Sequence, residues 1–230
     1  MKQQNKIQKL IQMFDNPEAV SDIKDQIIKL QETLACYRCA LLEVETKFRV
    51  LDERFSIRNE RNPIESIKTR IKSPESMLEK IRRKGYPQTF DSIKHLNDIA
   101  GVRVICSFVQ DIYMLANCLI SQDDVTLIEM RDYIKHPKSN GYRSLHLIIE
   151  IPIFLHDEKR NMRVEVQLRT IAMETWANLE HKLRYKKDLS DETQEAISAK
   201  LLECALICER LDNQMQSVRN TIEKETEIPQ

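Results

Sequence analysis

The sequence predicts an α+β fold, a mixed β-sheet flanked by helices, with one long helix at each end of the chain. Two observations support this. Long stretches near both ends carry apolar residues at alternating spacings of three and four, and the segment between them interleaves β-branched runs with amphipathic ones. With 230 residues, 41% of them hydrophobic, the chain is long enough for one domain with extensions. We expect an N-terminal helical extension over 1–61, a central domain over 62–188 and a C-terminal helix over 189–230.

The two terminal helices are predicted from heptad-like seams. The first seam consists of Ile23, Ile27, Leu30, Leu34, Tyr37, Leu41, Val44, Phe48, Leu51 and Phe55. The second consists of Ile197, Leu201, Cys204, Cys208, Leu211, Met215, Val218 and Ile222. Such seams pack on the central domain, on each other or on another subunit, and the spacing alone does not choose among these.

The central domain begins with a helix that has Ser73 as N-cap and Pro74 in its first turn. The next elements follow from alternation and from turn residues. They are a short helix at 92–97, a strand at 102–109, a helix at 111–121, strands at 125–134, 144–155 and 163–169, and a helix at 172–185.

Composition excludes several classes of protein. Basic and acidic residues balance at 36 each, which argues against a general nucleic-acid coat. The three glycines are scattered, so neither a Walker A loop nor a dinucleotide fingerprint is present, and side-chain cations would have to hold any nucleotide phosphates. No apolar run is long enough to span a bilayer, and the N-terminus lacks signal-peptide features, so we expect a cytoplasmic protein with no membrane partner.

Six cysteines include a CxxC at Cys36 and Cys39 and a second pair at Cys204 and Cys208. Both pairs lie inside helical patterns, and no histidine pair stands near them at zinc-finger spacing. We therefore expect buried or half-buried structural thiols rather than a metal or redox site.

Two carboxylates are candidates for a metal site. In the strand at 163–169, Glu165 alternates with apolar neighbours and so faces away from the core, although a solvated outer face would look the same. Asp98 stands just before the strand at 102–109. Two carboxylates completed by substrate phosphates and water would hold Mg²⁺. The simpler alternative for Asp98 is an ion pair with Arg103.

A cluster of basic residues occupies positions 68–84. Ser76, Lys80 and Arg83 are spaced to share one face of the helix that starts at Pro74. Such a face could hold a triphosphate, contact RNA or simply be solvated.

The polar turn at 135–146 combines cations with an aromatic ring. Tyr142 could stack on a base while Lys138 and Arg143 bind phosphates, or it could cap the core, with His146 structural. On the last central helix Trp176, Leu179 and Leu183 are expected in the core. Glu180 could accept hydrogen bonds from a purine or form an ion pair.

Six short motifs, which follow one another along the chain, resemble the synthetase domain of the RelA/SpoT homologues. They are most similar to the proteins that consist of this domain alone, the small alarmone synthetases. The motifs are Thr-Arg-Ile-Lys at 69–72, Asp-Ile-Ala-Gly-Val-Arg at 98–103, Arg-Asp-Tyr-Ile at 131–134, Asn-Gly-Tyr-Arg-Ser-Leu-His at 140–146, Glu-Val-Gln-Leu-Arg-Thr at 165–170 and Trp-Ala-Asn-Leu-Glu-His at 176–181. The segments 62–65 and 137–146 are similar to the RelP-type branch.

This resemblance implies a GTP/GDP pyrophosphokinase of the nucleotidyltransferase-like fold. Such an enzyme moves the β,γ-pyrophosphate of ATP to the 3′-hydroxyl of GDP or GTP, making ppGpp or pppGpp and AMP. It further implies that Asp98 and Glu165 bind Mg²⁺ and that Glu165 acts as base. The implied ATP-binding residues are Arg70, Lys72, Ser76, Lys80, Arg83 and Arg103, with Arg70 and Arg103 around the adenine. The implied GDP/GTP-binding residues are Arg131, Lys138, Tyr142, His146, Gln167, Arg169 and Glu180, with Tyr142 stacked on guanine.

Position 174 is Glu where related proteins often carry Asn or Asp, so we assign it no role. The only His-Asp pair, His156-Asp157, is read as incidental, so synthesis without hydrolysis is expected. The resemblance also suggests a homo-oligomer, specifically a tetramer, with RNA as a regulator at most. Two rival functions remain: a nucleotidyltransferase, although its Gly-Ser and Asp-x-Asp motifs are missing, and a non-catalytic RNA-binding protein.

Overall fold

The computed structural model describes residues 17–59, 62–184 and 190–226. Its elements are α2 (Pro17–Asn59), β1 (Ile64–Ile71), α3 (Pro74–Arg83), the 3₁₀ helix η1 (Phe90–His95), β2 (Ala100–Cys106), α4 (Val109–Ile120), β3 (Thr126–Asp132), β4 (Leu145–Phe154), β5 (Lys159–Thr170), α5 (Ile171–Arg184) and α6 (Asp191–Thr226). Residues 1–16, 60–61, 185–189 and 227–230 lie outside the described residues, so the predicted segment limits there stay predictions. Among the described helices, none has the length and hydropathy needed to cross a bilayer.

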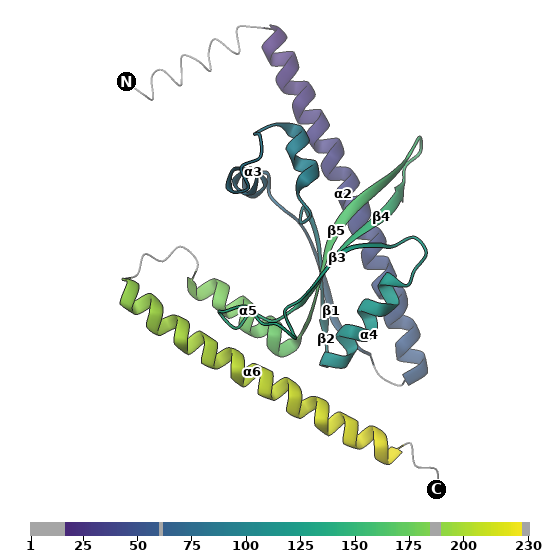
Figure 1. Ribbon diagram of the computed structural model, residues 1–230. Coiled ribbons are helices and arrows are strands. Elements are labelled where there is room, and N and C mark those ends of the chain that lie inside the picture. Colours follow the sequence, from purple (N-terminus) through teal and green to yellow (C-terminus); the bar gives the residue numbers. More distant parts are fainter. Residues whose placement is uncertain (1–16, 60–61, 185–189, 227–230) are drawn as a thin grey trace.

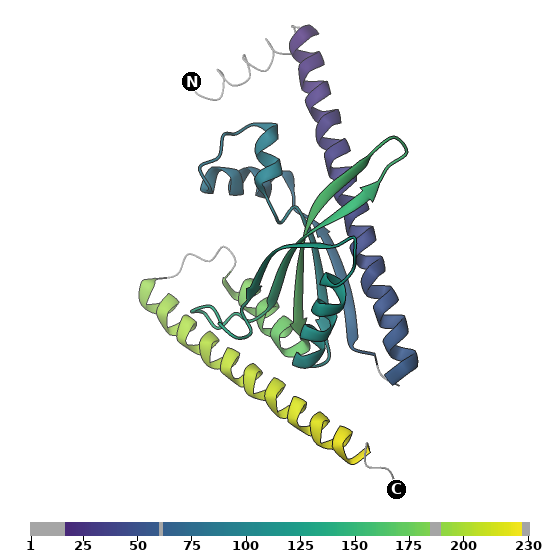
Figure 2. The same ribbon diagram turned by 45° about the vertical axis from the view of Figure 1, so that its right-hand side comes forward.

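The predicted mixed sheet is confirmed. Five strands are ordered β1-β2-β5-β4-β3, with β2 and β5 parallel and the other neighbours antiparallel. Helices α2 and α4 cover one side of the sheet, and α3 and α5 lie on the other (Figures 1 and 2). Strand β1 was not predicted, because its residues are mostly polar and its burial does not alternate.

The main core lies between the sheet and α2. The middle of the N-terminal seam is buried there, with Val44 and Phe48 fully enclosed against strand residues such as Val104 and Val166. Burial of this kind is worth roughly 1.5–3 kcal/mol per large apolar side chain. Ile27, nearer the helix start, stays 51% exposed because α2 extends beyond the sheet.

The C-terminal helix forms as predicted, and the predicted seam packs in its first part only. Its residues Ile197, Leu201 and Cys208 lie in the cluster around Trp176, whereas the seam beyond Cys208 is exposed. Leu201 and Ala205 pack with Trp176, whose indole Nε1 donates to the Leu201 carbonyl at 2.8 Å. The seam residues Leu211, Met215 and Val218 are about half exposed, as are Leu179 and Leu183 of α5. Cys204 is also exposed, so the prediction of a buried or half-buried thiol is wrong there, whereas the other five cysteines conform.

The loop before β4 reaches α6 through Gly141. This residue has a φ of +87°, and a Cβ added to it would stand 2.5 Å from the Cβ of Ala205. Glycine is therefore needed both for its backbone angle and for the close approach of α6.

We predict that Gly141→Ala lowers the free energy of unfolding by about 2–4 kcal/mol, because backbone strain and overpacking add. Urea unfolding followed by circular dichroism measures this. Gly85→Ala is the matched control: Gly85 has a φ of +69°, but no described atom lies within 4 Å of the added Cβ. Equal losses in the two variants would contradict the packing of α6 against this loop.

Candidate active site

One face of the sheet carries two rows of mostly polar residues that cross all five strands. Paired residues on neighbouring strands point to the same face, so the register defines the rows. The first row is Lys68, Arg103, Gln167, His146 and Arg131, and the second is Arg70, Gly101, Glu165, Ile148 and Glu129. We call this surface the polar face. It collects predicted site residues from every strand.

The two predicted adenine-binding arginines lie on neighbouring strands of the polar face. Gly101 faces Arg70, whose Cγ and Nε lie 3.5 Å from where a Cβ on the glycine would stand. Arg70 and Arg103 both line a small cavity of about 120 Å³ between β1 and β2. The lack of a side chain at Gly101 lets the Arg70 guanidinium lie close to the sheet.

Asp98 precedes β2 and binds two lysines. Its Oδ2 lies 3.0 Å from Lys72 Nζ and 2.6 Å from Lys80 Nζ. The alternative pairing of Asp98 with Arg103 is therefore wrong, because Arg103 pairs with Glu174 instead. Burial acts to raise the pKa of Asp98, but the hydrogen bonds and charges of Lys80 and Lys72 outweigh it and hold the pKa below its usual value.

The remaining predicted phosphate ligands, Ser76 and Arg83, are exposed on α3. The amide of Ser76 donates to Ser73 Oγ at 3.3 Å, which caps the helix as predicted. Lys80 and Arg83 both lie on α3, and Lys80 is the one that contacts Asp98.

One observation in particular indicates that Asp98 and Glu165 could bind a Mg²⁺ ion. Asp98 Oδ1 is buried and finds no hydrogen-bond partner among the described residues, so an anionic oxygen is left to accept a ligand. Glu165 is close enough that the charge of Asp98 acts to raise its pKa. The described residues contain no group of three His, Cys, Asp or Glu able to hold a metal, so further ligands would be phosphate and water oxygens.

A chain of polar contacts leads from Glu165 to Arg169. Glu165 Oε1 lies 3.4 Å from His146 Nδ1, His146 Nε2 lies 2.8 Å from the Tyr142 hydroxyl, and that hydroxyl accepts from Arg169 Nη2 at 2.5 Å. Gln167 Nε2 donates to Glu165 Oε2 at 2.9 Å. Since the Tyr142 oxygen accepts from Arg169, its proton can go to His146 Nε2, which leaves Nδ1–H facing Glu165.

The charges of this chain follow from burial and neighbours. Burial, aided by Arg169 and Lys138, lowers the pKa of His146 against the opposing effect of Glu165, so the ring is neutral at neutral pH. Burial acts to raise the pKa of Glu165, but its hydrogen bonds from His146 and Gln167 hold the pKa below its usual value. Glu165 is therefore an ionised carboxylate with an oriented neutral histidine beside it.

The Tyr142 ring lies against a small apolar cluster and beside two cations. It packs beside the cluster of Trp176, Leu201 and Ala205. Its ring also has Lys138 Nζ at 4.8 Å and the Arg169 guanidinium at 5.0 Å from its centre. The ring thus has cations beside it, and its stacking on a nucleotide base stays a prediction.

Two other predicted residues are less closely connected to this network. Arg131 shares a row with His146, but its Nε donates to Glu129 Oε1 at 2.6 Å on an exposed part of β3. Glu180 Oε1 accepts from Asn140 Nδ2 at 3.5 Å, next to the Tyr142 loop.

His156 and Asp157 are exposed in the turn between β4 and β5, in keeping with an incidental pair.

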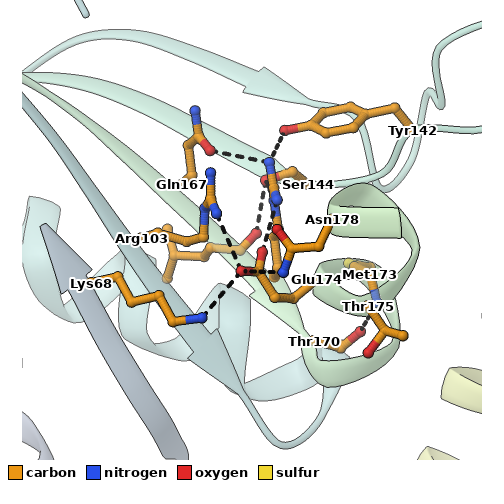
Figure 3. Close-up of polar contacts among 12 residues, drawn as sticks. Lys68, Arg103, Tyr142, Ser144, Gln167, Thr170, Met173, Glu174, Thr175 and Asn178 are labelled. Atoms are coloured by element: carbon orange, nitrogen blue, oxygen red, sulfur yellow. Dashed lines mark hydrogen bonds and ion pairs between the residues drawn. The ribbon is translucent and has the colours of Figure 1, made fainter. Parts of the chain in front are cut away.

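Glu174 was assigned no role from the sequence, yet it lies at the centre of a cluster of three basic side chains (Figure 3). It lies on α5, is 7% exposed, and contacts Arg169, Arg103 and Lys68. Burial acts to raise its pKa, but Asn178 and the two arginines hold the pKa below its usual value. The available signal was a carboxylate one helical turn into the helix that follows an arginine-bearing strand.

Comparisons with known proteins agree with this geometry. Residues 69–190 match the family described as a region found in RelA/SpoT proteins. The chain is 40% identical over 205 residues to the GTP pyrophosphokinase YwaC of Bacillus subtilis (strain 168), covering 89% of this chain and 97% of that protein. It is 35% identical over 191 residues to the GTP pyrophosphokinase YjbM of the same strain, covering 83% and 89%.

Solved structures give the same result. The chain resembles small alarmone synthetase 1 from Bacillus subtilis bound to its product pppGpp, with a TM-score of 0.76, 34% identity and coverage of 85% and 98%. It resembles small alarmone synthetase 2 from the same organism with a TM-score of 0.74, 41% identity and coverage of 84% and 98%. The protein belongs to the RelA/SpoT family and, within it, is a small alarmone synthetase.

The Asp98 cluster predicts a pH effect on stability. Because folding lowers its pKa, the contribution of Asp98 is complete above the unfolded value of about 3.9 and is lost as the pH falls through the lower folded value. Asp98→Asn should cost about 1.5–3 kcal/mol of unfolding free energy at pH 7 and as much at pH 5. Chemical unfolding at several pH values should show this difference shrinking below about pH 4. A difference that grows on acidification would contradict the ion pairs with Lys72 and Lys80.

Proposed function

We propose that this protein is a GTP pyrophosphokinase that transfers the β,γ-pyrophosphate of ATP to the 3′-hydroxyl of GDP or GTP, forming ppGpp or pppGpp and releasing AMP. The observation that carries the proposal is the polar face. Its register aligns the arginine pair beside Gly101 with the chain formed by Glu165, His146 and Tyr142. The names of the similar proteins and their product complex support the same reaction.

On the donor side, Arg70 and Arg103 hold the adenine between guanidinium planes. Lys72, Lys80, Arg83 and Ser76 bind the triphosphate, with the two lysines shared between Asp98 and phosphate oxygens. Binding fixes the β-phosphorus in line with the incoming hydroxyl, which is the main task in phosphoryl-type transfer.

On the acceptor side, Tyr142 stacks on the guanine, and Glu180 accepts from its edge. Lys138, Arg169, Gln167 and His146 surround the nucleotide, with Arg131 farther along the same row. Glu165 takes the proton of the 3′-hydroxyl as O3′ bonds to the β-phosphorus. The bond from the β-phosphorus to the oxygen bridging the α-phosphate breaks, and AMP leaves.

Asp98 and Glu165 would hold Mg²⁺, which neutralises phosphate charge as it spreads in the transition state. The buried, unpartnered Oδ1 of Asp98 supports this role. Because Glu165 would then serve both as ligand and as base, its carboxylate must be ionised. The low pKa that its hydrogen bonds produce favours that state.

We further propose synthesis without hydrolysis, in the cytoplasm, where both nucleotide substrates occur, and membership of the RelP-type branch. A homotetramer is also proposed. The half-exposed line of Leu211, Met215 and Val218 on α6 supports contact with a second copy, because such apolar surface is costly in water. Sedimentation velocity over a range of concentrations measures the assembly, and a monomer throughout would reject it.

Glu165→Gln should lower kcat by about a thousandfold or more while the fold is retained, because it removes both the base and a metal ligand. Purified protein is incubated with Mg²⁺, ATP and GDP or GTP, and the nucleotides are separated by anion exchange. Wild type should yield AMP and a more highly charged guanosine nucleotide.

Glu158→Gln, in the turn between β4 and β5, is the matched control and should keep wild-type activity. Near-normal turnover by folded Glu165→Gln would reject its role. Release of pyrophosphate with a nucleotidylated acceptor would identify a nucleotidyltransferase instead, and RNA binding without turnover would identify the other rival.

Tyr142→Ala should raise the KM for GDP by about tenfold or more, since stacking on a base is worth about 1–3 kcal/mol. Initial-rate kinetics with each nucleotide varied in turn measures the change. Tyr142→Phe keeps the ring and removes only the hydroxyl contact with His146 and Arg169, so its effect on this KM should be smaller. A rise confined to the KM for ATP would mean that the two nucleotide sites are exchanged.

A further inference from the structure

Glu174 is a buried carboxylate at the polar face that the proposed reaction leaves without a role. Its two oxygens point to different neighbours. Oε2 accepts from Arg169 Nη1 at 2.8 Å, and Oε1 accepts from Arg103 Nη1 at 3.2 Å. Asn178 Nδ2 donates to Oε1 at 3.0 Å, and Lys68 Nζ lies 3.4 Å from the same oxygen (Figure 3).

The two arginines belong to different halves of the proposed site. Arg103 comes from β2 and lines the cavity that also contains Arg70, where ATP is proposed to bind. Arg169 comes from β5, and its Nη2 donates to the Tyr142 hydroxyl at 2.5 Å and to Gln167 Oε1 at 3.1 Å, on the side proposed for the guanine nucleotide. One carboxylate therefore contacts a key cation of each half.

The charge balance makes this carboxylate important. Arg169 is 4% exposed, and Arg103 is also largely enclosed, with its Nε buried and unpartnered among the described residues. Cations this close repel each other in a medium of low dielectric, and each would turn toward solvent without an anion between them. A guanidinium held at one end by a carboxylate keeps its remaining N–H groups aimed in fixed directions.

We propose that Glu174 is a positioning residue that orients Arg103 for ATP and Arg169 with Tyr142 for the guanine nucleotide, so that both half-sites depend on one anchor. Glu174 touches neither nucleotide and takes no proton. The inference rests on the proposed function, since it concerns how the two substrates are placed for that reaction.

The test is Glu174→Gln, which keeps the shape of the side chain and removes its charge. The KM for ATP and the KM for GDP should each rise by about tenfold, as expected when hydrogen bonds to a charged group are weakened. Asp111→Asn is the matched control. Asp111 is 1% exposed and pairs with Arg219 at 3.0 Å, and it lies on α4 across the sheet. This control should lower the Tm but leave both KM values unchanged.

A double variant separates the two halves. Once Arg103 is removed in Arg103→Ala, Glu174→Gln should raise the KM for GDP but no longer change the KM for ATP. An unchanged KM for both nucleotides in Glu174→Gln, whatever its Tm, would show that the residue is merely structural. A rise for one nucleotide alone would overturn the shared anchor.

Asn178→Ala provides a second variant in case Glu174→Gln does not fold. It removes one hydrogen bond to Glu174 Oε1 without leaving a buried charge unpaired. A smaller rise in both KM values is expected, and no rise in either would overturn the proposal. If wild type makes no guanosine product, the proposed function fails by itself. Equilibrium binding of AMPCPP then tests the anchor, and equal affinity in wild type and Glu174→Gln would overturn it.

Discussion

The parallel pairing of β2 with β5 is the constraint on which the site depends. This register places Gly101 beside Glu165 and Arg103 beside Gln167, and the neighbouring strands extend both rows across the sheet. A shift of one residue would turn the polar residues of a strand into the core and its valines outward. The hydrophobic core against α2 thus specifies the arrangement of the polar face as well as the fold.

The same face concentrates cations, which the chain must stabilise before any nucleotide binds. Asp98 forms ion pairs with Lys72 and Lys80. Glu174 forms ion pairs with Arg103, Arg169 and Lys68. The roles proposed for these two carboxylates differ: Asp98 binds a metal ion, and Glu174 orients arginines. Among the described residues nothing donates a hydrogen bond to the buried Oδ1 of Asp98, so this oxygen can accept a metal ion, whereas both oxygens of Glu174 accept hydrogen bonds.

Much of the fold was predictable from residues alone. Apolar periodicity located both long helices. Four of the strands were located by alternation or by β-branched and apolar runs, and two of them, β2 and β4, are buried along nearly their whole length. Strand β1 was not predicted, because it is an edge strand of mostly polar residues, among them Lys68 and Arg70 of the candidate site. On α6 the seam predicted the packing of Leu201 but not that of Ala205, and its later residues Leu211 and Met215 stay half exposed.

The sequence predicted which residues belong to the candidate site better than it predicted which of them contact each other. Motifs named most of the residues on the polar face, but only the folded structure shows that Arg103 pairs with Glu174 rather than with Asp98. The position of Glu174, early in the helix that follows the strand with Arg169, was a signal for that one ion pair. Its contacts with Lys68 and Arg103 could not be predicted, because those residues come from two other strands and only folding brings them together. Spacing along one chain carries no information about such contacts.

The most direct measurement follows the label of [γ-³²P]ATP in the presence of Mg²⁺ and GDP, with AMP counted in the same samples. If the polar face joins two nucleotides for pyrophosphoryl transfer, each AMP formed should be matched by one labelled guanosine nucleotide more highly charged than GDP. Labelled phosphate or pyrophosphate released without any labelled guanosine nucleotide would contradict the account.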